Sequence, residues 1–349
     1  MNKWLKRFTA GVILPAVLLL SACNSVTQNE SAETSKDGIQ SRTIKAGIGN
    51  SESHPQGQGM VKFAELLEEK SGGKMKVQNF FDATLGDDIK MTEALQAGLQ
   101  EVTVPSTSPL VGMIKEYGIY DFPFVFQSEE EAYTVLDGAV GQKLLDKLPE
   151  HDLVGLGYWE NGFRNLTNSK HPVATAEDFK GLKIRTMQNE VHLKAFSKLG
   201  ANPSPMAFSE VFTALESGTV HGQENPLATI TTQKYNEVQD YLSLTKHVYT
   251  PFVFLVSKKF WDGLSEEEQK IMSEAVREAG EYQRALSQEE NKKALKLLEE
   301  AGMKINEVSS EEATKMKEII QPVTDEFAKK YGEDLVEEMM KEVEKVRGN

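Results

Sequence analysis

The segment from Ser265 to Ala301 constrains the fold of this chain more than any other, because it contains no proline and only one internal glycine, Gly280. The segment is rich in Glu, Lys, Ala and Leu, and the capping-box pattern Ser265-x-x-Glu268 predicts a helix start. As one helix it would be about 55 Å long at roughly 1.5 Å per residue, which exceeds the width of a small lobe. We therefore expect a helix that spans two lobes. The alternative is two helices separated near Gly280.

Short apolar strands alternate with amphipathic helices in the rest of the chain. A strand is predicted at 42–48, a helix at 60–70, a second strand at 74–81 and a second helix at 87–97. This alternation favours the α/β class, in which helices cover a sheet. The capping pattern at Ser128-x-x-Glu131 predicts a further helix, and the one at Ser309-x-x-Glu312 opens a terminal helical segment that runs to about Val346.

The N-terminus has the pattern of a bacterial lipoprotein secretion signal. Basic residues precede an apolar stretch at 8–20, and Leu20-Ser21-Ala22-Cys23 resembles a lipobox. The apolar stretch is shorter than the roughly 20 residues needed to span a bilayer. We predict that residues 1–22 are a signal peptide and that Cys23 is acylated. The alternatives are a transmembrane anchor and a buried free thiol.

Cleavage of the signal peptide and acylation of Cys23 would give an extracytoplasmic protein anchored by lipid to the cell membrane. We expect it in the periplasm or on the outer face of the cytoplasmic membrane. Residues 24–41 are polar and lack aromatics, so 23–41 are predicted to be the acylated cysteine and a flexible tether. Cys23 is the single cysteine of the chain, and no intramolecular disulfide is expected.

The charge and the motif content argue against several function classes. The formal net charge is −14, and the predicted signal peptide removes three further positive charges, which disfavours nucleic-acid binding. The six histidines show no metal-ligand spacing, and no G-x-S-x-G, H-E-x-x-H or C-x-x-C motif occurs. We therefore expect no catalysis, no metal and no cofactor.

Two arginines are the strongest candidates for ligand binding. Only seven of the basic residues are arginine, and between 44 and 276 there are two, Arg164 and Arg185, both beside apolar residues. A guanidinium remains charged when desolvated and matches a carboxylate with two parallel hydrogen bonds. The pair indicates a carboxylate clamp in a cleft. The alternative is two structural bridges to Asp178 or Glu210.

A turn at 220–226 brings amide and carboxyl groups together before a proline, as Val220-His221-Gly222-Gln223-Glu224-Asn225-Pro226. Such a loop either offers side chains to a pocket or caps the next helix. The residues alone leave both interpretations open.

Several motifs together resemble one known family, the DctP-type substrate-binding proteins of TRAP transporters. The resemblance runs from about Arg42 to the C-terminus. It rests on motifs spread through the chain: Gly73-Lys74, Leu85-Gly86-Asp87-Asp88, Ala97-Gly98, Asp121-Phe122-Pro123-Phe124-Val125-Phe126, Gly162-Phe163-Arg164-Asn165, Asp178-Phe179-Lys180-Gly181-Leu182-Lys183-Ile184-Arg185, Leu199-Gly200-Ala201-Asn202-Pro203, Pro205-Met206-Ala207-Phe208-Ser209-Glu210 and Gly222-Gln223-Glu224-Asn225-Pro226.

The resemblance implies an α/β, two-lobe clamshell of the periplasmic-binding-protein type (type II), with a long helix crossing both lobes. It implies that Arg185 makes the main two-pronged contact with a ligand carboxylate and that Arg164 and Asn225 add hydrogen bonds. The predicted lobes are 42–161 plus about 251–292, and 162–250 plus about 293–349. Hinge strands are expected near Trp159–Gly162 and Tyr249–Phe252.

Other residues are candidates for the opposite end of the ligand. Glu52, His54, Asp88 and Asn161 are candidate ligand contacts, with Glu160 beside them; shaping of surface and loops is the alternative for these residues. The sequence departs from the family pattern at His221, where the turn usually begins with aspartate. Pro105 and Gly49 stand where sialic-acid binders carry acidic and asparagine residues, which argues against sialic acid.

The expected function is that of a monomeric solute-binding lipoprotein. It captures a small carboxylate, either a C4-dicarboxylate or a sugar acid such as a uronate, and delivers it to the small and large membrane subunits of a TRAP symporter. A ligand-sensing module for a receptor and an extracellular enzyme acting on a carboxylated substrate are the alternatives.

Overall fold

The computed structural model describes residues 38–348. The predicted signal peptide, Cys23 and most of the predicted tether lie outside the described residues. Within them, no helix combines the length and the apolar character that crossing a bilayer requires.

One mixed sheet organises the described part of the chain, with strands in the order β2-β1-β3-β8-β4-β7-β5-β6 and β9 paired to β8. The pairs β1/β2, β1/β3, β5/β6, β5/β7 and β8/β9 are parallel, whereas β8 is antiparallel to β3 and β4, and β7 is antiparallel to β4. The strands are β1 (Arg42–Gly47), β2 (Met75–Phe80), β3 (Val102–Thr103), β4 (Leu153–Asn168), β5 (Lys183–Thr186), β6 (Asn202–Pro205), β7 (Gly222–Asn225), β8 (Tyr241–Ser257) and β9 (Lys304–Glu307).

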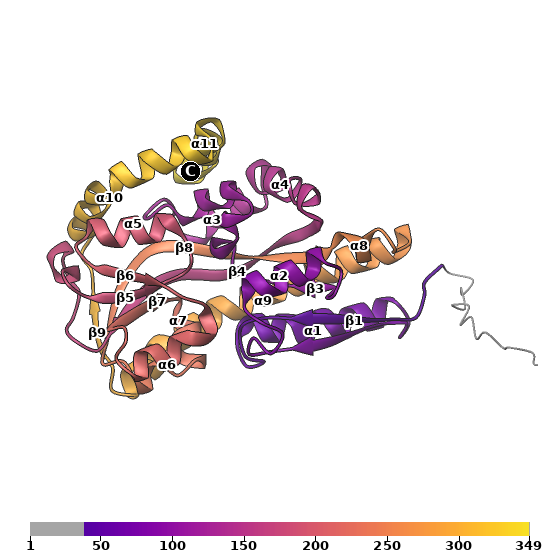
Figure 1. Cartoon of the computed structure of the whole chain (residues 1–349), viewed down its shortest axis with the longest axis horizontal. Coiled ribbons are helices and arrows are strands. Elements are labelled where there is room, and N and C mark those ends of the chain that lie inside the picture. Colours follow the sequence, from indigo (N-terminus) through magenta and orange to yellow (C-terminus); the bar gives the residue numbers. More distant parts are fainter. Residues whose placement is uncertain (1–37, 349) are drawn as a thin grey trace, which may run out of the picture. The chain divides into compact units, whose positions relative to one another are not determined.

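The two longest strands, β4 and β8, lie side by side and connect the two sides of the sheet (Figure 1). Trp159 pairs with Phe252 and Phe163 with Tyr249, so the two predicted hinge segments are cross-strand neighbours. The register shifts between Glu160 and Gly162. Gly162 has a φ of 114°, a conformation that a residue with a Cβ adopts only with strain.

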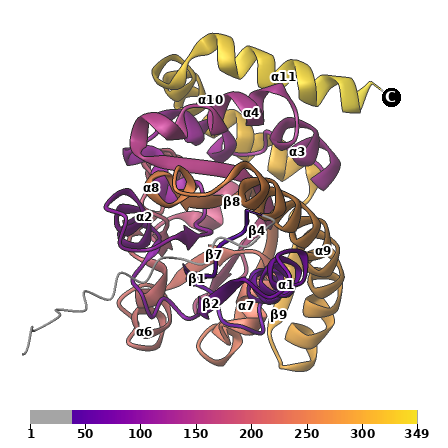
Figure 2. The same cartoon turned by 90° about the vertical axis from the view of Figure 1, so that its right-hand side faces the viewer.

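Helices cover both faces of the sheet (Figures 1 and 2). The helices are α1 (Pro55–Lys70), α2 (Asp88–Gln96), α3 (Glu129–Leu136), α4 (Ala139–Leu145), α5 (Glu190–Lys198), α6 (Val211–Glu216), α7 (Leu227–Thr232), α8 (Lys258–Trp261), α9 (Glu266–Glu300), α10 (Ser310–Tyr331) and α11 (Glu333–Arg347). Short 3-10 helices lie at Ser108–Gly112, Lys115–Asp121, Leu148–His151, Ala176–Phe179, Phe208–Glu210 and Tyr235–Glu237.

The long segment is one helix, α9, of 35 residues, which opens with the predicted capping box between Ser265 and Glu268. Gly280 does not interrupt it. A Cβ at this position would lie 2.8 Å from Nε1 of Trp159, so the glycine allows the indole of β4 to pack against the helix backbone. Trp159 Nε1 donates to the carbonyl oxygen of Val276 at 3.3 Å. The glycine is therefore a packing requirement rather than a helix break.

Helix α9 contributes to two hydrophobic clusters, which agrees with the prediction that it crosses from one region to another. Its first half, with Met272 and Val276, packs in a cluster with α1, β1 and β3; α1 and α9 lie side by side in Figure 2. Its last turns, with Leu298, pack with α6 and α7. A third cluster lies under α3, α5, α10 and α11.

One predicted helix boundary differs from the structure. Helix α1 begins at Pro55, earlier than predicted, because the His54 side chain caps it and proline suits the first helical position. The predicted terminal helical segment from Ser309 to about Val346 is confirmed; it consists of two helices, α10 and α11, separated at Gly332, where φ is 121°. A residue with a Cβ adopts such a φ only with strain, so glycine is favoured at Gly332, where α10 ends.

Candidate functional site

A pocket containing about 530 Å³ of space, part of it open to solvent, lies among the ends of several strands. Polar side chains from distant parts of the sequence meet there. Its lining residues are Gly49, Asn50, Gln56, Asp87, Asp88, Ser106, Pro109, Asn161, Arg164, Arg185, Met187, Gln188, Phe208, Asn225, Thr229 and Phe252.

Arg185, at the third position of β5, is 2 % exposed. Its Nε and Nη2 donate to the carbonyl oxygen of Met206 at 3.2 and 2.8 Å, and its Nη1 has no hydrogen-bond partner among the residues that the structure describes. Burial lowers the pKa of Arg185 to about 10, so the side chain is charged at neutral pH. Within residues 38–348 no carboxylate lies within ion-pair distance of it. The pocket wall thus holds a buried positive charge with no ion-pair partner in the described part of the chain.

Arg164, in β4, is equally buried but is already paired. Its Nε and Nη2 donate to the two carboxylate oxygens of Glu224, the second at 2.9 Å, and Nη1 donates weakly to Thr250 Oγ1 at 3.4 Å. This is the ion pair of the structural alternative, although the partner is neither Asp178 nor Glu210. Asp178 instead caps the 3-10 helix at Ala176–Phe179.

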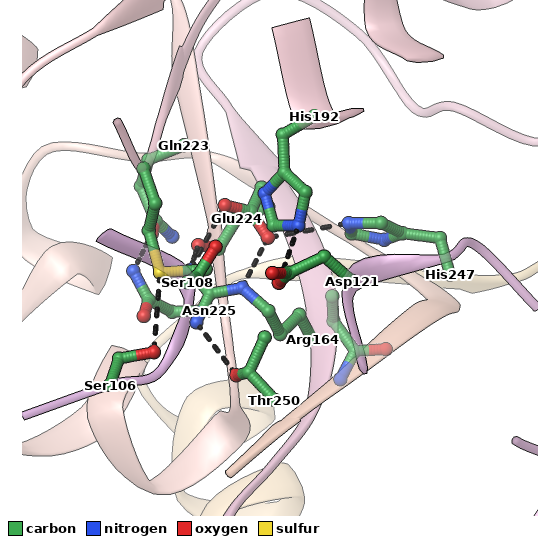
Figure 3. A network of polar contacts seen from close by, with 12 residues as sticks. Ser106, Ser108, Asp121, Arg164, His192, Gln223, Glu224, Asn225, His247 and Thr250 are labelled. Atoms are coloured by element: carbon green, nitrogen blue, oxygen red, sulfur yellow. Dashed lines mark hydrogen bonds and ion pairs between the residues drawn. The ribbon is translucent and has the colours of Figure 1, made fainter. Parts of the chain in front are cut away.

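Glu224 connects the pocket to a buried polar network (Figure 3). His247 Nε2 lies 3.3 Å from Glu224 Oε2, and nearby His192 Nε2 lies 3.1 Å from Asp121 Oδ1. Burial by itself would raise the pKa of Glu224, but Arg164 and His247 more than offset burial and hold this pKa well below its usual range. Glu224 is therefore ionised, and it compensates the charge of Arg164.

Asn225, the last residue of β7, stands opposite Asn165 of β4 and is 3 % exposed. Its Nδ2 donates to Gln223 Oε1, and the second hydrogen of the amide has no acceptor among the described residues. The turn that enters β7 is tied to β5, because His221 Nδ1 accepts from the backbone nitrogen of Lys183 at 3.2 Å. A Cβ at Gly222 would lie 2.2 Å from the carbonyl oxygen of Thr167, so only glycine fits there.

Asp88 and Asn161 also line the pocket. Asp88 is the first residue of α2, is half-buried, and accepts through Oδ2 from the backbone nitrogen of Ser106 at 3.3 Å. Burial and the neighbouring Asp87 raise the pKa of Asp88 to about 7, against the opposing effects of Ser106 and Arg185. Asn161, in β4, is buried and makes no side-chain hydrogen bond to another described residue.

Glu52 and His54 are not among the lining residues. The imidazole of His54 accepts from the backbone nitrogen of Gln56 at 3.0 Å through Nδ1, and its Nε2 lies 3.1 Å from Thr229 Oγ1. Burial lowers the pKa of His54 to about 3, so the imidazole is neutral and supports the pocket through its contact with Thr229.

The Glu52 side chain is exposed, and the backbone carbonyl oxygen of Glu52 accepts from the Gln58 side chain. Glu160 lies outside the pocket, with its backbone held by Gln283 of α9 at 2.9 and 2.7 Å.

Sequence reasoning missed several lining residues, above all Asn50, Gln56 and Ser106. The first two lie in the loop and helix start around Gly49–Gly59, a segment that composition marks only as a loop. Across the described residues, no group of three or more His, Cys, Asp and Glu side chains is placed to hold a metal ion. The arrangement as it stands suits an anion with further polar groups, and the fold and pocket together define a solute-binding protein.

Comparisons with known proteins agree with this class. A family model described as bacterial extracellular solute-binding protein, family 7, matches residues 46–330. A solute-binding protein of Verminephrobacter eiseniae is 42% identical over 243 residues, which are 70% of this chain and 72% of the relative. The 2,3-diketo-L-gulonate-binding periplasmic protein of Escherichia coli is 38% identical over 253 residues, which are 72% of this chain and 77% of the relative.

Solved structures extend the likeness to the fold. The sugar acid binding protein of Advenella mimigardefordensis, crystallised in complex with galactonate, superposes with a TM-score of 0.87 at 47% identity, over 88% of this chain and 99% of that chain. The chain belongs to family 7 of the bacterial extracellular solute-binding proteins, the DctP-type binding proteins of TRAP transporters. This family is not one of enzymes, and the predicted two-lobe α/β fold is confirmed.

Proposed function

We propose that the pocket captures a small organic acid by its carboxylate, with Arg185 as the main contact. The observation that carries this proposal is the buried Arg185 guanidinium, whose Nη1 has no hydrogen-bond partner and whose charge has no counter-ion within ion-pair distance in residues 38–348. A buried charge left in this state is costly unless an opposite charge binds it. A ligand carboxylate supplies both the counter-ion and the missing hydrogen-bond acceptor.

Arg164 and Asn225 play a supporting part in this proposal. The Nη1 group of Arg164 makes only the long contact to Thr250, and the Asn225 amide keeps one free hydrogen. Both donate to the ligand carboxylate, while Glu224 orients the Arg164 guanidinium. The galactonate bound by the Advenella protein and the diketogulonate named for the Escherichia coli protein are acids of this kind.

Closure of two lobes around the ligand is the second part of the proposal. The lobes are 42–161 with about 251–292, and 162–250 with about 293–349. The register shift at Glu160 and Gly162, opposite Pro251 and Thr250, supports a hinge in the paired β4 and β8 strands. Arg164, Arg185 and Asn225 come from one lobe and Asp88 from the other, so a bound ligand favours the closed form.

The protein is lipid-anchored through Cys23 in this proposal and acts as a monomer that delivers its ligand to the membrane subunits of a TRAP transporter. Glu52 and His54, which stand outside the pocket lining, act by shaping the loop before α1.

A thermal-shift screen tests the binding function directly. Aldonates, uronates and C4-dicarboxylates are compared with the corresponding alditols, which keep the hydroxyl groups and lack the carboxylate. A tight ligand raises the free energy of unfolding by RT ln(1 + [L]/Kd), and the unfolding temperature rises with it. We expect shifts with acids only. Equal shifts with alditols, or none with any acid, would remove Arg185 as a carboxylate site.

Small-angle scattering with the strongest ligand should show a smaller radius of gyration, and an unchanged radius would contradict closure.

A further inference from the structure

The pocket has hydrogen-bond acceptors without donors as well as the donor without an acceptor on Arg185. Oδ1 of Asn50 is buried and has no partner, and Oδ1 of Asp88 accepts no hydrogen bond from any described residue. Both residues line the pocket. We propose that Asn50 and Asp88 form an acceptor pair that selects an acid with one carboxylate and several hydroxyl groups, and that excludes dicarboxylates. This proposal rests on the proposed carboxylate site at Arg185.

The amide orientation of Asn50 is determined by backbone geometry. Gln56 Nε2 donates to the backbone carbonyl oxygen of Val104. Because a carbonyl oxygen only accepts hydrogen bonds, the nitrogen of the Gln56 amide must point towards it. The Gln56 oxygen must then face Asn50, and it accepts from Asn50 Nδ2 at 2.8 Å. The oxygen of Asn50 is therefore the atom without a partner among the described residues; it is buried, in a residue that is 5 % exposed. A buried acceptor of this kind calls for a donor, which a ligand hydroxyl supplies and a carboxylate does not.

Asp88 differs from its neighbour Asp87 in having no cation within ion-pair distance among the described residues. Asp87 Oδ1 caps α2 through the backbone nitrogen of Lys90 at 2.9 Å, and its Oδ2 lies 3.6 Å from Lys90 Nζ. Asp88 has only the backbone nitrogen of Ser106 at 3.3 Å. One of its oxygens is thus open to the pocket, and its negative charge is available to a ligand hydroxyl.

The charge balance of the pocket favours one negative charge on the ligand. Glu224 compensates Arg164, so Arg185 contributes the single uncompensated positive charge among the described lining residues. A monocarboxylate neutralises it and leaves Asp88 to accept from a hydroxyl. A dicarboxylate of the same length brings a second carboxylate towards Asp88. Like charges in a desolvated site repel unless one of them is protonated.

Proton linkage makes the distinction measurable, because the pKa of Asp88 lies at about 7. The charged groups that face Asp88 are Asp87 in its own helix, Arg185 from β5 and, farther along the pocket wall, Arg164 with Glu224; His54 behind the wall is neutral. Dicarboxylate binding requires protonated Asp88, so its affinity falls as pH rises through this range. Hydroxyl donation to ionised Asp88 has the opposite requirement. The affinity ratio of the two ligands must therefore change with pH.

The test measures calorimetric affinities for galactonate and succinate with the wild-type protein, Asp88→Asn and, as a charge-matched control, Asp82→Asn at an exposed position outside the pocket. Asparagine at 82 retains the positive φ of that site. We expect wild type to prefer galactonate by at least about 100-fold, and Asp88→Asn to reduce that preference by about 10-fold or more. The ratio in Asp82→Asn should equal that of wild type.

The pH series needs no variant and remains decisive if Asp88→Asn does not fold. Between about pH 6.5 and about pH 8, where both ligands are ionised, the preference of wild type for galactonate should grow by about tenfold. A preference that is constant with pH, or unchanged in folded Asp88→Asn, would overturn the role of Asp88. Tight succinate binding without galactonate binding would overturn it too, while leaving the carboxylate site intact. Binding of neither ligand, nor of any acid in the thermal-shift screen, would overturn both proposals.

Discussion

Arg164 and Glu224 form a buried ion pair in which one guanidinium donates to both oxygens of one carboxylate. The two residues are brought together by β4 and β7, where Leu166 stands opposite Glu224. Because of this pair, the two arginines of the pocket differ in their charge compensation. Arg164 is compensated by Glu224, whereas Arg185 has no ion-pair partner and a free Nη1 among the described residues.

Replacement of Arg185 by lysine should abolish most of the ligand affinity although the charge is kept. The single ammonium of lysine lacks the planar fork of donors, so it cannot bind the Met206 carbonyl oxygen and a ligand carboxylate at the same time in the arrangement that the guanidinium allows. We expect a loss of about 2–5 kcal/mol in binding free energy, measured by calorimetry with the acid identified in the screen. Arg277→Lys, at an exposed position in α9, is the control. Near-native affinity in folded Arg185→Lys would rule out the clamp.

Replacement of Glu224 by glutamine should destabilise the empty protein, because it leaves the Arg164 charge buried without a counter-ion. We expect a loss of about 3–5 kcal/mol in the free energy of unfolding, measured by urea titration at neutral pH. Exposed Glu216→Gln is the matched control. Equal stability of Glu224→Gln and wild type would contradict the account of Arg164 as a compensated charge.

The same ion pair predicts a pH dependence of stability. The folded-state pKa of Glu224 lies below its unfolded value, so its contribution is fully present above the unfolded pKa of about 4.3 and is lost as pH falls towards the folded value. Wild type should therefore lose stability below about pH 4.5 more steeply than Glu224→Gln. Parallel acid-unfolding curves, followed by circular dichroism, would show that Glu224 makes no such contribution.

Replacement of Gly280 by alanine should destabilise the protein, although alanine is the better helix former by about 1 kcal/mol. The added methyl group would lie 2.8 Å from Trp159 Nε1, and we expect a net loss of about 1–3 kcal/mol in the free energy of unfolding. The double variant Gly280→Ala/Trp159→Phe should show coupling between the two sites. Gly112→Ala, where a Cβ meets nothing within 4 Å, serves as control. A more stable Gly280→Ala variant would show that helix propensity outweighs this contact.

Replacement of Cys23 by serine should release the protein from the membrane without changing ligand affinity, because the predicted tether separates the anchor from the pocket. The measurement is the distribution of the protein between membrane pellet and supernatant of fractionated cells, with binding assayed on both forms. Retention of Cys23→Ser in the pellet would contradict lipid anchoring.

The helix positions and the candidate binding arginines of this protein follow from sequence features that act over a few residues. The capping box at Ser265 and the absence of proline determine α9, because helix initiation and propagation depend on neighbours within one or two turns. The scarcity of arginine likewise pointed to Arg164 and Arg185, since the advantage of a guanidinium in a desolvated site belongs to the residue type.

Tertiary structure alone decided how those residues are used. Glu224 as the partner of Arg164, the neutral His54 behind Thr229, and the Val104–Gln56–Asn50 chain all depend on contacts between residues far apart in sequence or on burial. Gly280 shows the same limit, because a potential helix break became a contact surface for Trp159. Hydrogen-bond partners, desolvation and steric fit are properties of the packed chain, and local patterns do not contain them.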